Sequence, residues 1–305
     1  MTLAELIASV RRIEVRTNRV VNDMMVGAYL SHFKGRGMDF EELREYMPGD
    51  EVRDIDWNVT YRMGRPFVKR FREERELAMV LAVDISASSA FGSLRRSKRE
   101  FAAEIAGTLA ISASRSSDKV ALLLFTNQVE LFVPPRKGRR HILRLIREML
   151  FFEPARRGTN IPAALAFLNH VLHRRSIVFL LTDFLHSFAS ATTQPQAGRD
   201  TLQELGLTNA RHDLVCIHLH DPRENDLPSA GLLTIEDAET GELLEIDSSR
   251  ALVRERFARQ NAERLAELDR AFRRAGIDTL SFSTSEDFAQ TLQRFFETRR
   301  GRRRG

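Results

Sequence analysis

The chain has 305 residues, 43% of them hydrophobic and 29% charged, which is enough to bury a full core and favours about two domains. Five arginines within residues 299–305 account for the formal net charge of +5, so the rest of the chain is near neutral and does not mark a nucleic-acid-binding face. The longest apolar runs fall well short of the ~20 residues of a membrane span, and the first 15 residues lack the apolar core of a signal peptide, so we expect a soluble cytoplasmic protein. Cys216 is the single cysteine, so we expect no internal disulfide.

The N-terminal part of the chain, residues 1–76, is predicted to form its own helical and β segment. Residues 1 to about 30 carry apolar side chains at helical spacing. Residues 32–76 mix charges with scattered aromatic side chains, which predicts a small compact subdomain rather than a linker. Within it, Pro48-Gly49-Asp50 predicts a turn, and Trp57 is the expected apolar anchor.

From residue 77 to residue 298, short apolar runs alternate with helical patterns. The expected strands are 77–85, two within 119–135, 176–184, 213–222 and 277–283, and the expected helices are 95–114, 141–151, 162–172, 200–206, 250–275 and 286–298. Alternation of this kind predicts an α/β fold with a doubly wound, mostly parallel sheet. The strand runs lack a two-residue alternation, as expected for strands that are covered on both faces.

Two further segments stand apart from this alternation. Residues 231–249 hold two alternating stretches around Glu239-Thr240-Gly241, which predicts an inserted β-hairpin with a glycine turn. Residues 299–305 are predicted to be a disordered basic tail.

Oxygen-bearing side chains follow two of the expected strands and start one helix. Asp84, Ser86 and Ser88 end the first strand of the alternating region, Thr159 precedes a helix, and Asp183 ends the strand at residues 176–184. Ligands of open parallel sheets bind beyond the carboxyl ends of the strands, where the strand order reverses. Two carboxylates and three hydroxyls are the donors that a hard cation such as Mg²⁺, or Mn²⁺ in its place, prefers, whereas a zinc site is disfavoured.

This set, in this order, resembles the metal-ion-dependent adhesion site of von Willebrand factor A domains. The resemblance spans roughly residues 77–296. It implies that Ser86 and Ser88 bind the metal through their hydroxyls, that Thr159 binds it directly or through water, and that Asp84 and Asp183 act mainly through water or as nearby anions. It also implies that a carboxylate of a partner protein completes the metal shell.

The N-terminal segment is similar to the signature of the bacterial family called domain of unknown function 58, whose members join such a segment to a von Willebrand A-like domain. The matching residues are Gly35-Arg36-Gly37, Phe40, Arg44, Tyr46, Pro48-Gly49-Asp50, Arg53, Ile55-Asp56-Trp57 and Arg62. The resemblance implies a MoxR-type AAA+ ATPase as a partner. The arginines are expected to pair with the neighbouring aspartates in a charged mini-core.

Together these observations predict a non-enzymatic protein–protein interaction module that presents Mg²⁺ and works as an adaptor or assembly factor. A first alternative is a metal-dependent hydrolase that uses the same ion, with His186 or His218 as the base. A second alternative is a scaffold whose metal site is vestigial. His218 and His220 point to one face of their strand and could form a separate metal pair, although packed histidines are the simpler interpretation.

Overall fold

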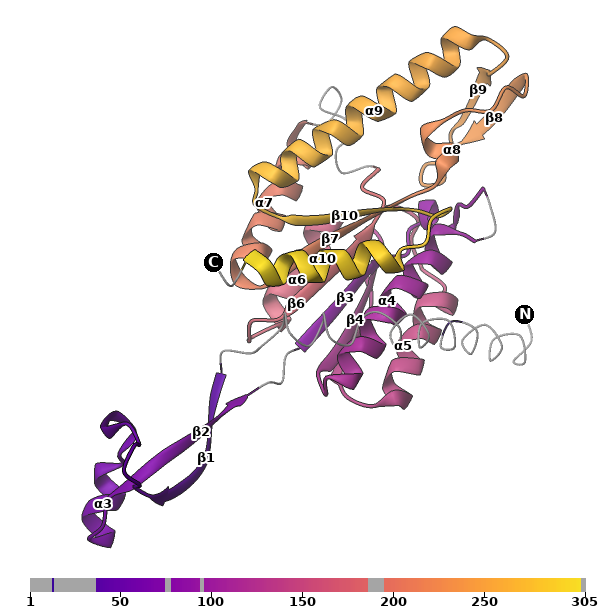
Figure 1. Cartoon of the computed structure of the whole chain (residues 1–305). Helices are drawn as coiled ribbons and strands as arrows, with labels where there is room; N and C mark the ends of the chain where they lie inside the picture. The colour runs from indigo at the N-terminus through magenta and orange to yellow at the C-terminus, as the bar shows by residue number, and fades with distance from the viewer. Residues whose placement is uncertain (1–12, 14–36, 75–77, 94–95, 186–194, 303–305) are drawn as a thin grey trace. The chain divides into compact units, whose positions relative to one another are not determined.

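The computed structural model describes residues 13, 37–74, 78–93, 96–185 and 195–302 (Figure 1). The described residues divide into two compact units, one within Phe33–Leu77 and one that includes the chain from Ala78 onward, which we call the A domain. Each unit is described by itself. Among these residues, every helix is too short or too polar to cross a bilayer.

The small unit is a two-stranded antiparallel ribbon that carries one short helix. Strand β1 (Gly37–Glu45) pairs with β2 (Phe67–Glu74), and α3 (Trp57–Met63) lies in the connection between them, after a 3₁₀ turn at Val52–Asp54. Helix α3 begins at its N-cap Asp56, whose carboxylate accepts the backbone N–H groups of Asn58 and Val59. The sequence predicts β structure in this segment but not the position of the two strands, because they are charged and lack the apolar runs that mark a buried strand.

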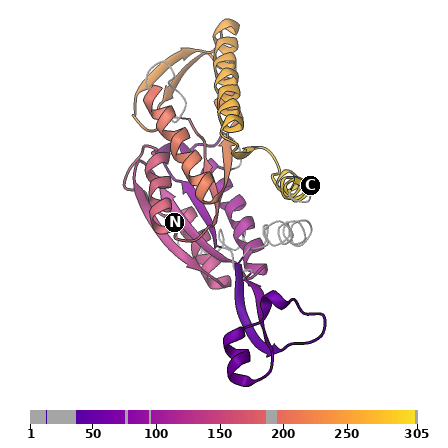
Figure 2. The same cartoon turned by 90° about the vertical axis from the view of Figure 1, so that its left-hand side faces the viewer.

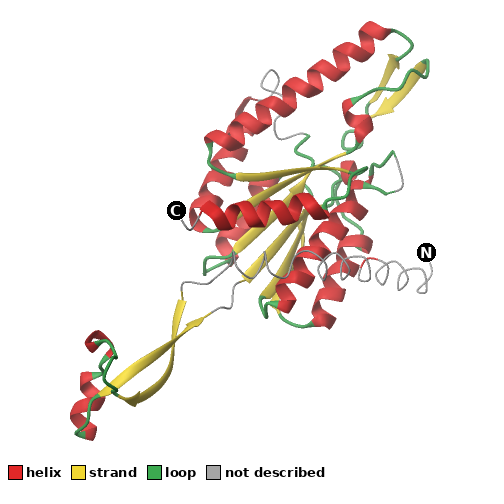
Figure 3. Cartoon of the chain, viewed as in Figure 1, coloured by secondary structure: helices red, strands yellow, loops and turns green. Residues whose placement is uncertain are grey.

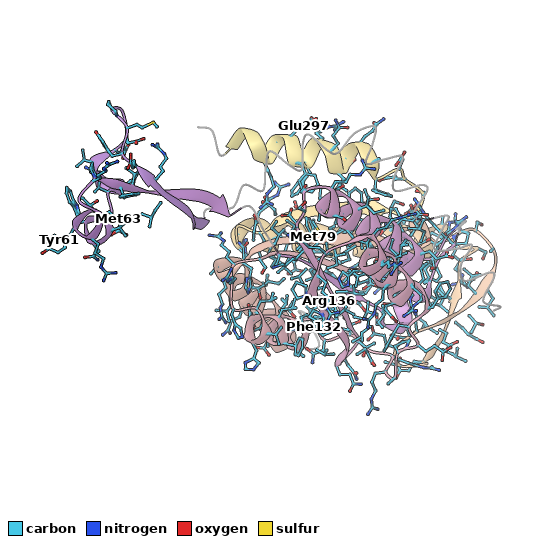
Figure 4. All side chains as sticks on the ribbon, turned by 90° about the horizontal axis from the view of Figure 1, so that it is seen from below. Tyr61, Met63, Met79, Phe132, Arg136 and Glu297 are labelled. Carbon is cyan, nitrogen blue, oxygen red and sulfur yellow. The ribbon has the colours of Figure 1, made fainter. Side chains whose placement is uncertain are left out.

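The predicted turn and one predicted ion pair are present in the small unit. The Asp50 carboxylate accepts the Met47 backbone N–H at 2.8 Å and the Arg44 guanidinium at 2.6 Å. The expectation that Trp57 is a buried anchor is wrong, because 65% of its surface is exposed. Tyr61 and Met63 of the same helix are also exposed and are labelled in Figure 4. The α3 helix therefore presents aromatic and apolar side chains to its surroundings instead of burying them.

Within the described residues of the A domain, six strands form one sheet, which confirms the predicted α/β fold (Figures 1 and 3). Their order is β10-β7-β6-β3-β4-β5, and only the edge strand β5 runs antiparallel to its neighbour. The strands are β3 (Ala78–Asp84), β4 (Lys119–Phe125), β5 (Val129–Arg136), β6 (Ile177–Thr182), β7 (Asp213–His220) and β10 (Asp278–Ser283). The chain proceeds outward from β3 in one direction and then from β6 in the other, so the strand order reverses between β3 and β6.

Helices cover both faces of the sheet (Figures 1 and 2). One face is covered by α4 (Lys98–Arg115), α5 (Arg139–Phe151) and α10 (Ala289–Arg302), and the other by α6 (Ile161–Val171), α7 (Pro195–Arg211) and α9 (Ala251–Arg274). The rings of Phe179 in β6 and Phe296 in α10 meet edge to face, with centroids 6.4 Å apart. On the opposite face Val80 and Ala82 of β3 pack into a core that includes Leu165 and Phe272.

Burial on both faces explains the continuous apolar runs of the strands. Every residue of β6 is buried, and so is every residue of β3 after Ala78. Cys216 lies in the middle of β7 with no exposed surface, and this burial raises the pKa of its thiol. The thiol is therefore a core side chain and not a reactive one.

The inserted hairpin is present, and α8 (Pro222–Asn225) precedes it. Strand β8 (Leu232–Glu236) pairs with β9 (Leu243–Asp247) so that Leu232 lies opposite Asp247 and Glu236 lies opposite Leu243. Most of its side chains are exposed or half-buried, so the hairpin contributes little to the core.

The predicted start of the disordered tail, at residue 299, falls within a helix of the A domain. Helix α10 runs to Arg302, and the guanidinium of Arg299 lies 2.6 Å from carboxylate oxygens of both Asp213 and Asp278. Arg299 is therefore a partly buried, ion-paired residue of the A domain, which corrects the tail prediction at this position. The predicted N-terminal helices lie outside the described residues except for Ile13, a helical residue that is buried beside Gly107 of α4.

Candidate functional site

The candidate site lies where the strand order reverses, at the carboxyl ends of β3 and β6. Asp84 is the last residue of β3, and Asp183 directly follows Thr182, the last residue of β6. These two strands are neighbours in the sheet, so their ends lie side by side. Sequence positions about 100 residues apart are thus brought to one edge by the parallel pairing alone.

The structure brings together all five residues that the sequence singled out. The Ser88 hydroxyl donates to Asp183 Oδ2 at 2.7 Å, and the Ser86 and Ser88 hydroxyl oxygens are 3.1 Å apart. Thr159 Oγ1 lies 3.4 Å from Asp84 Oδ2. The predicted convergence is therefore observed, whereas the assignment of these residues as metal ligands stays a prediction.

Hydrogen bonds of the local backbone fix the turn that carries Ser86 and Ser88. The Asp84 carboxylate accepts the Ser86 backbone N–H at 2.9 Å, which turns the chain sharply after β3 into the 3₁₀ helix Ala87–Ala90. The Ala87 N–H in turn donates to the Arg157 carbonyl at 2.9 Å, which fastens this turn to the loop that carries Thr159.

The turn after β6 is held in an uncommon conformation. Phe184 has φ +51°, a left-handed value that a bulky side chain adopts at a cost of about 1 kcal/mol. Its ring is fully buried against Phe272, with centroids 5.1 Å apart. Packing of Phe184 therefore holds the strained turn and fixes the position of the Asp183 carboxylate next to it.

Thr182 belongs to the site although the sequence did not mark it as a site residue. Its hydroxyl donates to Asp84 Oδ2 at 2.6 Å, and both side chains are buried. Burial, together with the neighbouring negative charge of Asp183, raises the pKa of Asp84 to about 6, against the opposing effect of the hydrogen bonds from Thr182 and Ser86. A nearby positive charge would therefore stabilise the ionised form of the Asp84 carboxylate.

Lys98 is the second residue that sequence reasoning missed. It is the first residue of α4, it is only 2% exposed, and its ammonium donates to Asp183 Oδ2 at 2.6 Å and to a carboxylate oxygen of Glu224. Burial acts to raise the pKa of Asp183, but the charge and hydrogen bond of Lys98 outweigh it and hold this pKa below its usual range. The available signal was a lysine at a helix N-terminus, where a positive charge is unfavourable unless carboxylates surround it.

Glu239, in the turn between β8 and β9, is the third missed residue. Its Oε1 accepts the Thr159 hydroxyl proton at 2.8 Å across 80 positions of sequence. A hairpin turn with a glutamate gives no signal of such a contact from sequence alone, because solvent-exposed acidic turns are common.

The oxygen donors are of the kind that Mg²⁺ or Mn²⁺ prefers. Adjacent ligands of an octahedral ion with bonds of about 2.1 Å are separated by roughly 3.0 Å, and the Ser86 and Ser88 oxygens are 3.1 Å apart. Ser88 donates its proton to Asp183, so its oxygen accepts from the Ser86 hydroxyl and is the kind of acceptor that a cation could contact instead. Among the described residues, no group of three or more His, Cys, Asp or Glu side chains is suited to hold a metal, so any cation here would depend on hydroxyl oxygens.

The histidine candidates take structural positions where they are described. The His218 and His220 rings stack with centroids 5.3 Å apart, and His218 Nδ1 lies 3.1 Å from the Ser281 hydroxyl. Asp221 caps α8 and accepts hydrogen bonds from Ser93 and Thr284, so it does not complete a metal site with these histidines. His186 lies outside the described residues.

Comparisons with known proteins place the chain in a family. An uncharacterized protein of Mycobacterium tuberculosis is 30% identical over 298 residues, which cover 97% of this chain and 90% of that protein. Among solved structures, an aerotolerance-related membrane protein from Bacteroides fragilis is 14% identical, with a TM-score of 0.47 over 74% of this chain and 99% of that one. The VWA domain of SpRpn10 is 12% identical, with a TM-score of 0.39 over 71% of this chain and 93% of that one. A family model matches residues 42–267, and the chain therefore belongs to the family described as Protein of unknown function DUF58.

Proposed function

We propose that the A domain is a non-enzymatic protein–protein interaction module that presents a divalent cation, Mg²⁺ or Mn²⁺, to a carboxylate of a partner protein. The hydroxyls of Ser86, Ser88 and Thr159 would hold the ion, and Asp84 and Asp183 would act through water or as neighbouring anions. The ion would supply a positive charge that is only partly offset, because its direct protein ligands are neutral hydroxyls. The observation that carries the proposal is the meeting of these hydroxyls with two buried carboxylates at the sheet edge.

A MoxR-type AAA+ ATPase is the partner class that we propose, with the chain as its adaptor or assembly factor. The support for this finer proposal is the resemblance of residues 35–62 to the family signature. A pull-down of such an ATPase by the full chain that is lost on adding EDTA would support both the partner and the role of the ion.

The hydrolase alternative receives little support from the described residues. Burial, with the charges of His220 and Arg264, lowers the pKa of His218 to about 3, which makes it a poor base at neutral pH. The void beside Asp84, Lys98 and Asp183 has room for about one water molecule, which is too small for a substrate.

The scaffold alternative with a vestigial site has one observation in its favour. The Lys98 ammonium already bonds Asp183, so part of the negative charge that would attract a cation is neutralised from within. A measurement of divalent-cation binding distinguishes a functional metal site from a vestigial one.

We expect the metal-free full chain to bind Mn²⁺ in calorimetry and Asp84→Ala to lose this binding. Because the ion is proposed to bind a hydroxyl at Thr159, Thr159→Val should weaken Mn²⁺ binding about 10-fold, and the matched control Thr159→Ser should keep it. Circular dichroism would establish that each variant is folded. Absence of Mn²⁺ binding by the wild type, or equal affinity in Asp84→Ala, would support the vestigial scaffold and overturn our proposal.

A further inference from the structure

The connection between β1 and β2, at one end of the ribbon of the small unit, exposes five large apolar side chains. Trp57 is 65% exposed and Tyr61 is 90% exposed. Met47, Val52 and Met63 lie in the same connection and are each more than 60% exposed, and Figure 4 labels Tyr61 and Met63. Tryptophan, tyrosine and methionine are enriched where proteins bind one another, and exposed apolar patches mark such surfaces. The composition of this connection is therefore that of a binding surface.

Helix α3 carries its two aromatic side chains on its outward face. Trp57 and Tyr61 are four positions apart, so they lie one above the other on one side of the helix. Another side of the helix faces the ribbon, where the Thr60 hydroxyl accepts the Phe67 backbone N–H at 3.0 Å. Arg62 follows Tyr61 and is also exposed. The helix is thus held to the ribbon on one side and presents aromatic rings and a positive charge on the other.

The small unit has little core of its own. Among residues 43–68, whose burial is described, only Val68 is buried. An isolated two-stranded ribbon is marginally stable in water, and folded units near about 40 residues usually need a disulfide, a metal or oligomerisation. The single cysteine, Cys216, lies in the A domain, and the described residues of the small unit form no group of His, Cys, Asp or Glu suited to a metal. Oligomerisation is the remaining device, and a second copy is present wherever the chain is.

The exposed area is close to what a dimer interface requires. A standard interface buries about 800 Å² per partner, of which roughly 450–500 Å² is apolar. Aromatic side chains supply about 150–250 Å² each, so Trp57 and Tyr61 together offer roughly 300 Å² at their observed exposures. Met47, Val52 and Met63 supply most of the remaining apolar area.

The charges around α3 make this surface complementary to itself. Arg62 lies in the last turn of α3, and Asp54 lies in the 3₁₀ turn just before the helix begins. Both are exposed, and neither makes an ion pair with a described residue. When two copies of the helix pack antiparallel about a two-fold axis, each Arg62 comes near the Asp54 of the other copy. The same arrangement brings Trp57 of each copy against Tyr61 of the other.

We propose that the outward face of α3 is a two-fold dimer interface between copies of this chain. Trp57 and Tyr61 of the two copies pack against one another, and Arg62 of each copy pairs with Asp54 of the other. The interface uses no residue of the candidate cation site, so EDTA should leave dimerisation unchanged, and the inference stands or falls separately from the proposed function.

Sedimentation velocity and the fluorescence of Trp57, the single tryptophan of the chain, test the inference on the full chain. We expect a monomer–dimer equilibrium with a dissociation constant of about 1–100 µM, and a blue shift of the Trp57 emission as the dimer forms. Tyr61→Ser should weaken dimerisation roughly 30-fold. The matched control Leu252→Ser, at a 77% exposed position of the A domain, should leave it unchanged.

Charge reversal separates an interface from a general loss of stability. Arg62→Glu and Asp54→Arg should each weaken dimerisation about 10-fold, and the double variant should recover most of the wild-type affinity because the pair is restored with opposite signs. Circular dichroism of each variant would establish that it is folded.

Two results would overturn the inference. One is a chain that stays monomeric up to about 100 µM, whether Trp57 emits as an exposed indole or is shielded by another part of the same chain. The other is a dimer whose affinity is unchanged by Tyr61→Ser and by both single charge reversals, because its interface would then lie elsewhere.

Discussion

Lys98→Met will lower the free energy of unfolding of the A domain by about 3 kcal/mol and its melting temperature by roughly 6–12 °C. Lys98 is 2% exposed and donates hydrogen bonds to Asp183 and Glu224, so its removal leaves a buried carboxylate without a counterion. Methionine fills similar space, and the expected loss is therefore electrostatic and not a cavity effect. We place the value at the lower end of the range for buried pairs because Glu224 is partly exposed and can regain water.

The matched control for this prediction is Lys137→Met, which removes an exposed lysine and should change the free energy of unfolding by less than about 1 kcal/mol. Adding Mn²⁺ should restore part of the stability of Lys98→Met, because a bound cation takes over the neutralisation of Asp183. Denaturant unfolding with and without the metal would measure both effects. If Lys98→Met is as stable as the wild type, Lys98 does not compensate a buried negative charge.

The stability of the A domain will fall in mild acid through His218, by about 2 kcal/mol between pH 7 and pH 5. Burial, with the charges of His220 and Arg264, lowers the pKa of His218 to about 3 in the folded state, against the opposing effect of Asp183. The unfolded chain has an ordinary histidine pKa near 6.5, so it binds a proton that the folded state does not accept between these two values. Stability from this group is therefore complete above the unfolded pKa and is lost as the pH falls toward the folded pKa.

The measurement is the difference in unfolding free energy between the wild type and His218→Asn as a function of pH. The difference is needed because the raised pKa of Asp84 acts with the opposite sign between about pH 4 and pH 6. Asparagine can keep the contact that His218 Nδ1 makes with Ser281, and His173→Asn, at an exposed position, controls for the substitution itself. A wild-type curve that runs parallel to that of His218→Asn would show that His218 is not held neutral by its surroundings.

The main elements of the A domain could be predicted because their patterns are local. Strands such as β3 and β6 are uninterrupted apolar runs that end in polar residues, and the helices between them have caps and helical spacing. The meeting of Asp84, Ser88 and Asp183 followed from the same reasoning, since parallel strands bring their carboxyl ends to one edge.

The residues that were missed depend on contacts that sequence spacing does not encode. The burial of Lys98 depends on its bonds to Asp183 and Glu224. These partners lie 85 and 126 positions further along the chain, so sequence spacing does not reveal them. Glu239 reaches Thr159 through the docking of an inserted hairpin, for which the sequence holds no register signal. The exposed Trp57 is the converse case, because a large aromatic side chain normally predicts burial, and a two-stranded ribbon offers too little surface to cover it.

The central claim is that the five converging residues bind one divalent cation, and anomalous scattering from crystals grown with Mn²⁺ tests it most directly. We predict an anomalous peak bounded by the hydroxyls of Ser86, Ser88 and Thr159, with Asp84 and Asp183 beside it. An ordered site that carries no such peak at saturating Mn²⁺, with the Lys98 ammonium on Asp183 as the positive charge there, would contradict the account.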